Sequence, residues 1–184
     1  EAFQIFRDYR PTSSHNDTAV NWLEDIMKIL SNVKSDGSAL KSEALFSPDD
    51  DCSLRICRML AAARQQIDIC VFTITDDRVT QAIQDAHQRR VKIRIISDNY
   101  KSLDLGSDIE LLSQSGIPVR IDDSEFHMHH KFALFDSEFV LTGSYNWTRS
   151  ASKNNSENLV ITNDPVLLQR FESEFEKLWN AFAA

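Results

Sequence analysis

From about residue 43 onward, hydrophobic and polar positions follow two alternating periods. Short runs rich in branched and aromatic residues predict strands at 43–46, 67–73, 91–96, 117–121, 131–135, 139–142 and 158–162. Between them apolar residues recur every three or four positions, which predicts helices over about 51–64, 76–90, 107–115 and from 165 to the end. The same spacing also covers residues 20–33, ahead of the first strand.

Strands and helices that alternate at this interval are typical of a sheet covered on both of its faces. We therefore predict an α/β fold with a mixed, largely parallel β-sheet flanked by helices. Residues 131–142 are the exception, because two strands separated by three residues predict a hairpin. We expect one domain over residues 43–184 and an N-terminal helical extension over 1–42, which either covers the core or contacts a partner.

The 184 residues carry a formal net charge of −8, which by itself disfavours a nucleic-acid partner. The acidic excess lies in residues 1–51 and 164–184, so the middle of the chain is nearly neutral. That middle part contains a basic cluster, which borders a substrate groove or is simply a solvated helix end and strand edge. Its members are Arg89, Arg90, Lys92, Arg94 and Lys101.

The sequence contains no apolar run of about 18 residues, so we expect no membrane-spanning segment in it. It begins with glutamate, which leaves open a leader or an anchor that has been removed. Its three cysteines lack the C-x-x-C spacing of a zinc site, and an odd number of them is more typical of a reducing compartment. We accordingly predict a cytoplasmic protein.

The chemistry-bearing residues are concentrated around the predicted hairpin. His129 and Lys131 are two positions apart, so in an extended strand their side chains share a face. Histidine populates both protonation states near neutral pH, which suits a nucleophile or a proton carrier. Lysine offers a permanent positive charge to a phosphate oxygen. This pair therefore has the parts needed to hold and attack a phosphate.

A turn and a carboxylate complete the candidate site. Ser144 and Asn146 supply neutral hydrogen-bond donors, and Gly143 leaves room for the backbone to approach an anion. Glu157 lies at the strand predicted over 158–162 and could accept the second ring N–H of His129, which would set the tautomer of the ring.

His129-x-Lys131 with Asp136 five residues later, followed by Gly143-Ser144-x-Asn146, resembles the H-x-K-x-x-x-x-D and G-S-x-N pattern of the phospholipase D superfamily. The sequence Met-His-His-Lys-Phe is most similar to the branch with a single motif. This branch includes the bacterial endonuclease Nuc and the mitochondrial phospholipase D/Zucchini proteins. The order of elements agrees with that branch from about Leu45 to Trp179.

The resemblance implies a role for each matching residue. It makes His129 the nucleophile that forms a phosphohistidine, with Lys131, Ser144 and Asn146 binding the phosphoryl oxygens. Glu157 would orient His129. The resemblance also implies that no metal or other cofactor takes part. Asp136 is carried over as a structural residue, as is Gly143.

A second histidine is needed to protonate the leaving oxygen, but the chain has only one copy of the motif. Two subunits paired about a two-fold axis would each supply one copy. We therefore expect a homodimer with one shared active site, as the resemblance also implies.

Three further residues are candidate substrate contacts. His127 shares the strand face of His129 and lines the cleft, or it is merely a polar residue at the strand entrance. Tyr145 stacks on a base or lies in the dimer contact, and Lys101 belongs to a loop after a strand where α/β sheets bind ligands. The three histidines at 127, 129 and 130 have no acidic or cysteine partner with metal-site spacing, so we predict no metal site.

The predicted function is a metal-independent phosphodiesterase, an endonuclease that cleaves a nucleic-acid backbone, with single strands favoured. One alternative keeps the chemistry and takes a phospholipid such as cardiolipin as the substrate. The other alternative is an idle nucleic-acid-binding or assembly module, which substitution of His129 would distinguish. DNA and RNA are not distinguished by the sequence.

Overall fold

The computed structural model describes residues 39–102 and 106–182, and Leu40–Ala184 form one compact unit. The helix predicted over residues 20–33 lies outside the described residues. The division into an extension over 1–42 and a domain over 43–184 therefore stays a prediction.

The centre of the unit is a seven-stranded sheet in the order β1-β7-β6-β5-β2-β3-β4. Each strand lies within two residues of the range predicted from the hydrophobic pattern. The strands are β1 (Ser42–Ser47), β2 (Gln66–Val71), β3 (Lys92–Ser97), β4 (Val119–Ile121), β5 (Lys131–Phe135), β6 (Phe139–Gly143) and β7 (Glu157–Thr162).

The sheet is mixed, as predicted, but it is not largely parallel. Among the described strands only β2–β3 and β3–β4 pair in parallel. The pairs β1–β7, β7–β6, β6–β5 and β5–β2 are antiparallel. Parallel neighbours need a crossover, and here that crossover is a helix between β2 and β3 and two short helices between β3 and β4. The hairpin of β5 and β6 reverses the chain without a crossover.

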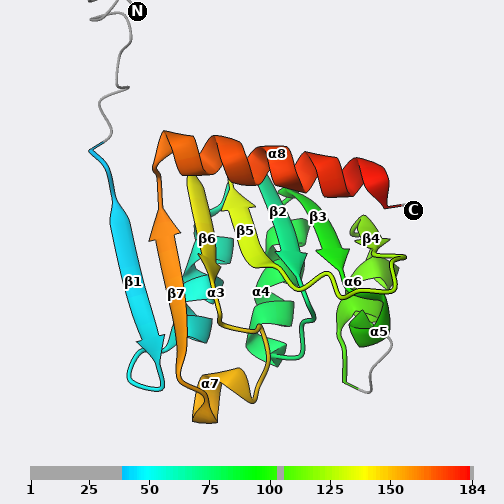
Figure 1. The fold of residues 1–184 in the computed structure, drawn as a ribbon, viewed down its shortest axis with the longest axis horizontal. Helices are drawn as coiled ribbons and strands as arrows, with labels where there is room; N and C mark the ends of the chain where they lie inside the picture. Colours follow the sequence, from blue (N-terminus) through cyan, green and yellow to red (C-terminus); the bar gives the residue numbers. More distant parts are fainter. Residues whose placement is uncertain (1–38, 103–105, 183–184) are drawn as a thin grey trace, which may run out of the picture. The chain divides into compact units, whose positions relative to one another are not determined.

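Helices cover both faces of the sheet (Figure 1). On one face α3 (Cys52–Ala62) and α4 (Asp77–Gln88) pack over a large core that includes Ile67, Ile69 and Ile95. On the other face α8 (Pro165–Ala181) covers a smaller core with Phe132, Leu134 and Phe175. Three shorter helices lie in the connections: α5 (Asn99–Ser102), α6 (Ile109–Gln114) and α7 (Ala151–Asn154).

Aspartates begin the three long helices, as their sequence positions predict. Asp51 accepts the N–H of Leu54, and Asp76 accepts that of Arg78. Asp164 accepts the N–H groups of Val166 and Leu167. Pro165, directly after Asp164, occupies the first turn of α8. The helices therefore start at residues that satisfy unpaired N–H groups of their first turns.

Strand directions bring several chain segments to one edge of the sheet. β2, β3 and β6 end at this edge, while β5 and β7 begin there, because β5 and β7 are antiparallel to their neighbours (Figure 1). Residues just before β5, just after β6 and at the start of β7 are thus neighbours in space. These are the positions of the histidine motif, the Gly-Ser turn and Glu157.

Candidate active site

Lys131 and His129 are in direct contact at this edge. Lys131 is the first residue of β5, and His129 lies in the segment before it. The Lys131 Nζ lies 3.2 Å from both Nδ1 and Nε2 of His129, and it donates to the His129 carbonyl oxygen at 2.9 Å. The amine therefore faces the imidazole and is anchored to the backbone of the same residue.

The environment of His129 favours its neutral form. Partial burial lowers the pKa of His129 below its usual 6.5, and the positive charge of Lys131 lowers it further. Phe72, just after β2, contributes to this apolar setting, with its ring centroid 4.5 Å from that of His129 in an edge arrangement. A neutral imidazole has a lone pair available for attack. Phe72 is not among the residues predicted for the site, because nothing in the sequence but its position near a strand end marks it.

Lys131 is buried although it is charged. Only 8% of the residue is exposed, and this burial lowers its pKa. The negative charge of Glu157 acts in the opposite direction and supports the ammonium. A charged lysine in such a setting is stabilised when an anion binds, because the anion replaces the lost water.

Glu157 lies close enough to act on Lys131, but it does not hydrogen-bond His129 in this structure. Its carboxylate accepts from Asn155 Nδ2 at 3.1 Å. The backbone N–H of Glu157 donates to Ser47 Oγ at the end of β1. The expected orientation of His129 by Glu157 thus stays a prediction, and the interaction supported by the geometry is electrostatic support of Lys131.

Gly143 is required by the packing of two strands. A Cβ at this position would lie 2.1 Å from the carbonyl oxygen of Asn158 on the neighbouring strand β7. This contact fits the structural role implied for Gly143, and the access of an anion to its backbone stays a prediction. Ser144 follows at the exposed edge, where its Oγ accepts from the Asn158 N–H at 3.0 Å. Asn158 therefore fixes the turn from both sides.

Asn146 is partly exposed, whereas Tyr145 is buried. The acceptor Oδ1 of Asn146 and the hydroxyl of Tyr145 are both buried without a hydrogen-bond partner among the described residues. Tyr145 is 1% exposed and packs in the large core. The expectation that Tyr145 contacts substrate is therefore wrong, because no face of its ring is open for stacking.

Asp136 lies at the opposite edge of the sheet, where β5 ends. Its carboxylate accepts the backbone N–H groups of Arg64, Gln65 and Gln66 at 2.7–2.9 Å. Burial alone would raise its pKa, but these three donors together lower it. This geometry supports the structural role implied for Asp136: it ties the end of α3 and the start of β2 to the hairpin.

His127 and Lys101 both approach the site through Asp98, at the end of β3. His127 Nδ1 lies 3.0 Å from Asp98 Oδ2, and the backbone N–H of Lys101 donates to Asp98 Oδ1 at 3.1 Å. Lys101 Nζ lies 6.0 Å from the centre of the Phe72 ring. Asp98 is fully buried, so it is a partner of these residues and not a substrate contact.

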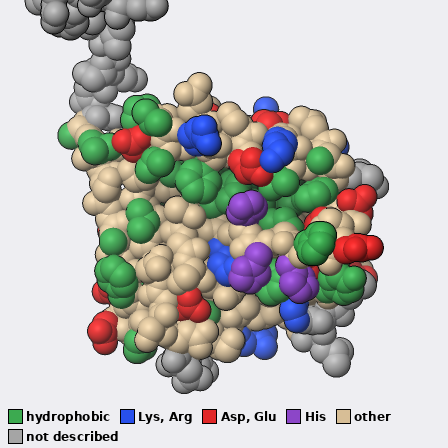
Figure 2. Space-filling model, in the orientation of Figure 1, with side chains coloured by type: hydrophobic (Ala, Val, Ile, Leu, Met, Phe, Trp, Pro, Cys, Tyr) green, Lys and Arg blue, Asp and Glu red, His purple; other side chains and the backbone are tan. Residues whose placement is uncertain are grey.

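The histidines lie along a hollow of about 460 Å³. Figure 2 shows them near the middle of one face, beside a basic side chain and bordered by hydrophobic side chains. Phe126 is 80% exposed at this border, and Leu178 and Phe182 form the wall contributed by the end of the chain. The full lining is Asp122, Ser124, Phe126, His127, Met128, His129, His130, Leu178 and Phe182.

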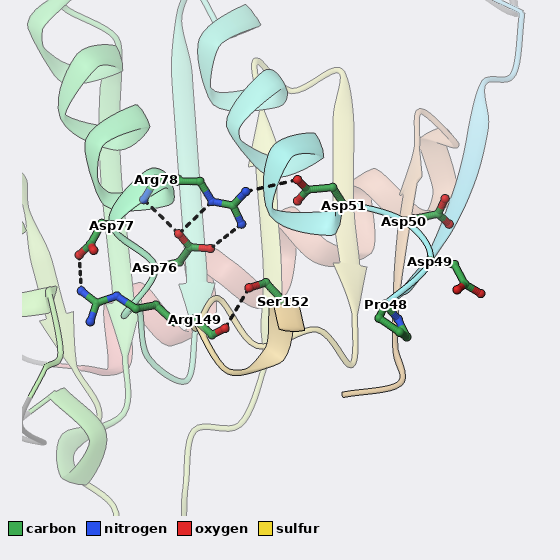
Figure 3. A pocket seen from close by; sticks show the side chains of 9 residues that line it. All are labelled: Pro48, Asp49, Asp50, Asp51, Asp76, Asp77, Arg78, Arg149 and Ser152. Atoms are coloured by element: carbon green, nitrogen blue, oxygen red, sulfur yellow. Dashed lines mark hydrogen bonds and ion pairs between the residues drawn. The ribbon is translucent and has the colours of Figure 1, made fainter. Parts of the chain in front are cut away.

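A second hollow, at the first turns of α3 and α4, is unsuited to an anion (Figure 3). Its two arginines are already paired: Arg78 with Asp76 and Asp51, and Arg149 with Asp77. Their positive charges are therefore offset by carboxylates. This leaves the histidine-lined hollow as the better candidate of the two for phosphate chemistry.

Within residues 39–102 and 106–182, no three histidine, cysteine, aspartate or glutamate side chains come together as a metal site. In the same part of the chain, no helix has both the length and the apolar character needed to cross a membrane.

The matches between this chain and known proteins agree on one family. Residues 56–179 match the family model described as "Cardiolipin synthase, PLD-like domain". The chain is 40% identical over 151 residues to the mitochondrial cardiolipin hydrolase of Chlamydomonas reinhardtii, covering 82% of this chain and 68% of that protein. It is 43% identical over 129 residues to the human protein of the same name, covering 70% of this chain and 51% of that one. The chain thus spans about half the length of the human relative.

A solved structure has the same fold. The phospholipase D family member Nuc from Salmonella typhimurium superposes with a TM-score of 0.73 and 28% identity, over 79% of this chain and 97% of that one. NucT from Helicobacter pylori has the same TM-score at 23% identity, covering 79% of this chain and 99% of that one.

The expected cytoplasmic location is wrong. Several relatives of this chain are named as mitochondrial proteins, which contradicts that expectation. Cysteine number and the lack of an apolar run do not specify which organelle receives a chain, so they are no physical basis for a cytoplasmic location.

The matched region contains the His129–Lys131 pair, the Gly143–Asn146 turn and the strands that bring them together. On this agreement of sequence, fold and site, the chain belongs to the phospholipase D superfamily of phosphodiesterases, in its branch with a single histidine-lysine motif.

Proposed function

We propose that this chain hydrolyses the phosphodiester of a phospholipid of the cardiolipin type through a phosphohistidine on His129. The observation that carries the proposal is the contact of the buried Lys131 Nζ with both ring nitrogens of His129. It places a nucleophile and a cation at the same point of the sheet edge, where one phosphate can meet both.

The first step is attack by a ring nitrogen of neutral His129 on phosphorus. The P–O bond to the leaving alcohol breaks as the N–P bond forms. Lys131 stabilises the negative charge on the phosphoryl oxygens, and Ser144 and Asn146 add neutral donors. The lowered pKa of His129 keeps the attacking form populated near neutral pH.

A second histidine then gives its proton to the leaving oxygen. In a homodimer this is His129 of the second copy, which afterwards takes a proton from the water that cleaves the N–P bond. The net reaction consumes one water and releases an alcohol and a phosphomonoester. All these steps use protein groups, so the proposal includes no metal.

Two observations favour a lipid over a nucleic acid. Relatives about 40% identical to this chain carry the name cardiolipin hydrolase. The hollow beside His129 also has apolar walls, at Met128, Leu178 and Phe182, which suit acyl chains better than a polyanionic backbone.

A nucleic-acid phosphodiester is the second candidate. The likeness to Nuc at 28% identity favours it, since the sequence resemblance is to an endonuclease of that name. The chemistry at His129 would be the same, and only the groups around the phosphate would differ.

The test is turnover of cardiolipin in mixed detergent micelles, with labelled single- and double-stranded DNA and RNA in parallel, all in EDTA. Wild type is compared with His129→Ala and with His87→Ala, a control on α4. We expect EDTA-resistant release of phosphatidic acid from cardiolipin that only His129→Ala abolishes. Cleavage of nucleic acid alone would contradict the lipid substrate and support the nucleic-acid phosphodiester instead. Activity that requires added metal would overturn the mechanism.

A further inference from the structure

Asp98 is an unusual carboxylate, because it is fully buried and yet saturated with donors. It follows β3 and has no exposed surface. Its Oδ1 accepts the backbone N–H groups of Tyr100 and Lys101, both at 3.1 Å. Its Oδ2 accepts the backbone N–H of Met128 at 3.0 Å and faces His127 Nδ1 at the same distance. A carboxylate in this position acts only as an acceptor.

The tautomer of His127 follows from this geometry. Nδ1 must carry the hydrogen that is donated to Asp98, so Nε2 is the nitrogen left for other contacts. The ring is held from two sides by aromatic edges, with centroids at 5.3 Å for Phe72 and 5.7 Å for Tyr100. The His127 side chain is nevertheless 52% exposed. It is a fixed ring with one accessible nitrogen.

This ring lies beside the reacting pair. Phe72 touches His127 with one part of its edge and His129 with another, at 5.3 Å and 4.5 Å between centroids. Both imidazoles therefore contact the same aromatic ring, and both line the same hollow. The positive charge of His127 is also one of the influences that lower the pKa of His129. Neither the nucleophilic step nor the phosphate contacts of Lys131 require His127.

We propose that His127, positioned by Asp98, binds a second phosphodiester group of the substrate while the first lies at His129 and Lys131. The inference rests on the proposed lipid hydrolysis and specifies its substrate as a phospholipid with two phosphodiesters. Cardiolipin has two such groups joined by one glycerol, whereas phosphatidylglycerol has one.

The contact requires the imidazolium form, in which Nε2 becomes a donor. The charged groups that face this ring are Asp98 from β3, Asp122 from the segment after β4, and His129 and His130 from its own segment. Asp98 is in direct contact and compensates the positive charge in the absence of substrate. The second phosphate then receives a charge-assisted hydrogen bond.

The test measures kcat and KM of the full chain on cardiolipin and on phosphatidylglycerol in the same mixed micelles. For His127→Gln we expect the KM for cardiolipin to rise by about tenfold, the loss of one hydrogen bond to a charged group. The kcat/KM for phosphatidylglycerol should change less than twofold. His127→Lys, which restores a cation, should recover the preference, and His87→Gln on α4 is the control.

Asp98→Asn tests the positioning role. It should raise the KM for cardiolipin as His127→Gln does, with no further rise in the double variant, because both act through one ring. Equal losses on the two lipids, or an unchanged preference in His127→Gln, would overturn the inference and leave the proposed function intact. A wild-type protein that hydrolyses neither lipid would overturn both. An effect of His127→Gln on oligonucleotides alone would assign the contact to a nucleic-acid phosphate instead and overturn the lipid inference.

Discussion

The ammonium of Lys131 lies 3.2 Å from each ring nitrogen of His129 and is bound to the His129 carbonyl oxygen at 2.9 Å. Two groups that repel each other when both are charged are therefore held together by the backbone. An anion that binds between the two groups would reduce their repulsion. Burial and the charge of Lys131 both lower the pKa of His129, so under the proposed mechanism the cation that would bind phosphate also favours the neutral form of the nucleophile.

Replacing Lys131 by methionine should separate activity from stability. The variant loses the charge that stabilises the phosphoryl oxygens, so we expect kcat/KM to fall by about 10²–10³-fold. Its melting temperature should be equal or higher, because burial disfavours the ammonium in the folded state. Lys177→Met, at an exposed lysine on α8, is the matched control. Near-normal turnover by Lys131→Met would contradict the proposed phosphate contact.

The protonation of His129 should follow its surroundings. Burial and the charge of Lys131 lower its pKa, so NMR titration should find it below 6.5, and Lys131→Met should raise it. As pH falls below 6.5 the unfolded chain takes up this proton first, and stability decreases until the pH passes the lower folded pKa. A pKa that does not respond to Lys131→Met would show that the two charges do not interact in solution.

Asp136 should matter for stability and not for chemistry. Asp136→Asn removes the charge that three backbone N–H groups hydrogen-bond, and we expect a loss of about 1–2 kcal/mol in the free energy of unfolding. Because its pKa is lowered, this contribution is complete above the ordinary value of 3.8 and is lost as pH falls through the folded pKa.

Denaturant unfolding at neutral pH and at pH 3 measures that contribution, with Glu138→Gln in the same turn as the control. The kcat of Asp136→Asn should be unchanged below the unfolding temperature. A large loss of kcat in a fully folded Asp136→Asn protein would instead place this residue in the chemistry.

Gly143→Ala should damage both stability and activity. The new Cβ would meet the Asn158 carbonyl oxygen at 2.1 Å, so one of the two strands must shift, at a cost of about 2–3 kcal/mol. The shift would displace Ser144 and lower kcat. Thr142→Ala, one residue earlier on β6, is the control. Thermal unfolding beside a turnover assay measures both effects, and a fully stable Gly143→Ala would mean that β6 and β7 are not so close.

Asn146→Leu should lower turnover without lowering the free energy of unfolding. The Asn146 Oδ1 is buried and accepts no hydrogen bond from the described residues, so an apolar group of similar shape should leave the free energy of unfolding unchanged or raise it by about 1 kcal/mol. Turnover should fall by about 10²-fold, because a phosphoryl donor is lost. Asn180→Leu, exposed on α8, is the control. Strong destabilisation would mean that Asn146 is a structural residue.

Much of the local structure is determined by the sequence itself. The ranges of the strands and long helices follow from hydrophobic period and from the aspartates that begin the helices, because both depend only on neighbours along the chain. The pairing of His129 with Lys131 is likewise a matter of two-residue spacing and the chain direction at the start of β5.

Other relationships depend on residues far apart in sequence, and only the tertiary structure decides them. Local periodicity does not specify which strands are adjacent, so the antiparallel pairing of β5 with β2 and of β7 with β6 was not anticipated. The same holds for Gly143, whose neighbour is Asn158 across the sheet, and for Tyr145, whose burial depends on the packing of α3 and α4. The Asp98–His127 contact joins the end of β3 to the start of β5. This contact exists because the fold brings both residues to one edge of the sheet. No pattern of neighbouring residues along the chain specifies it.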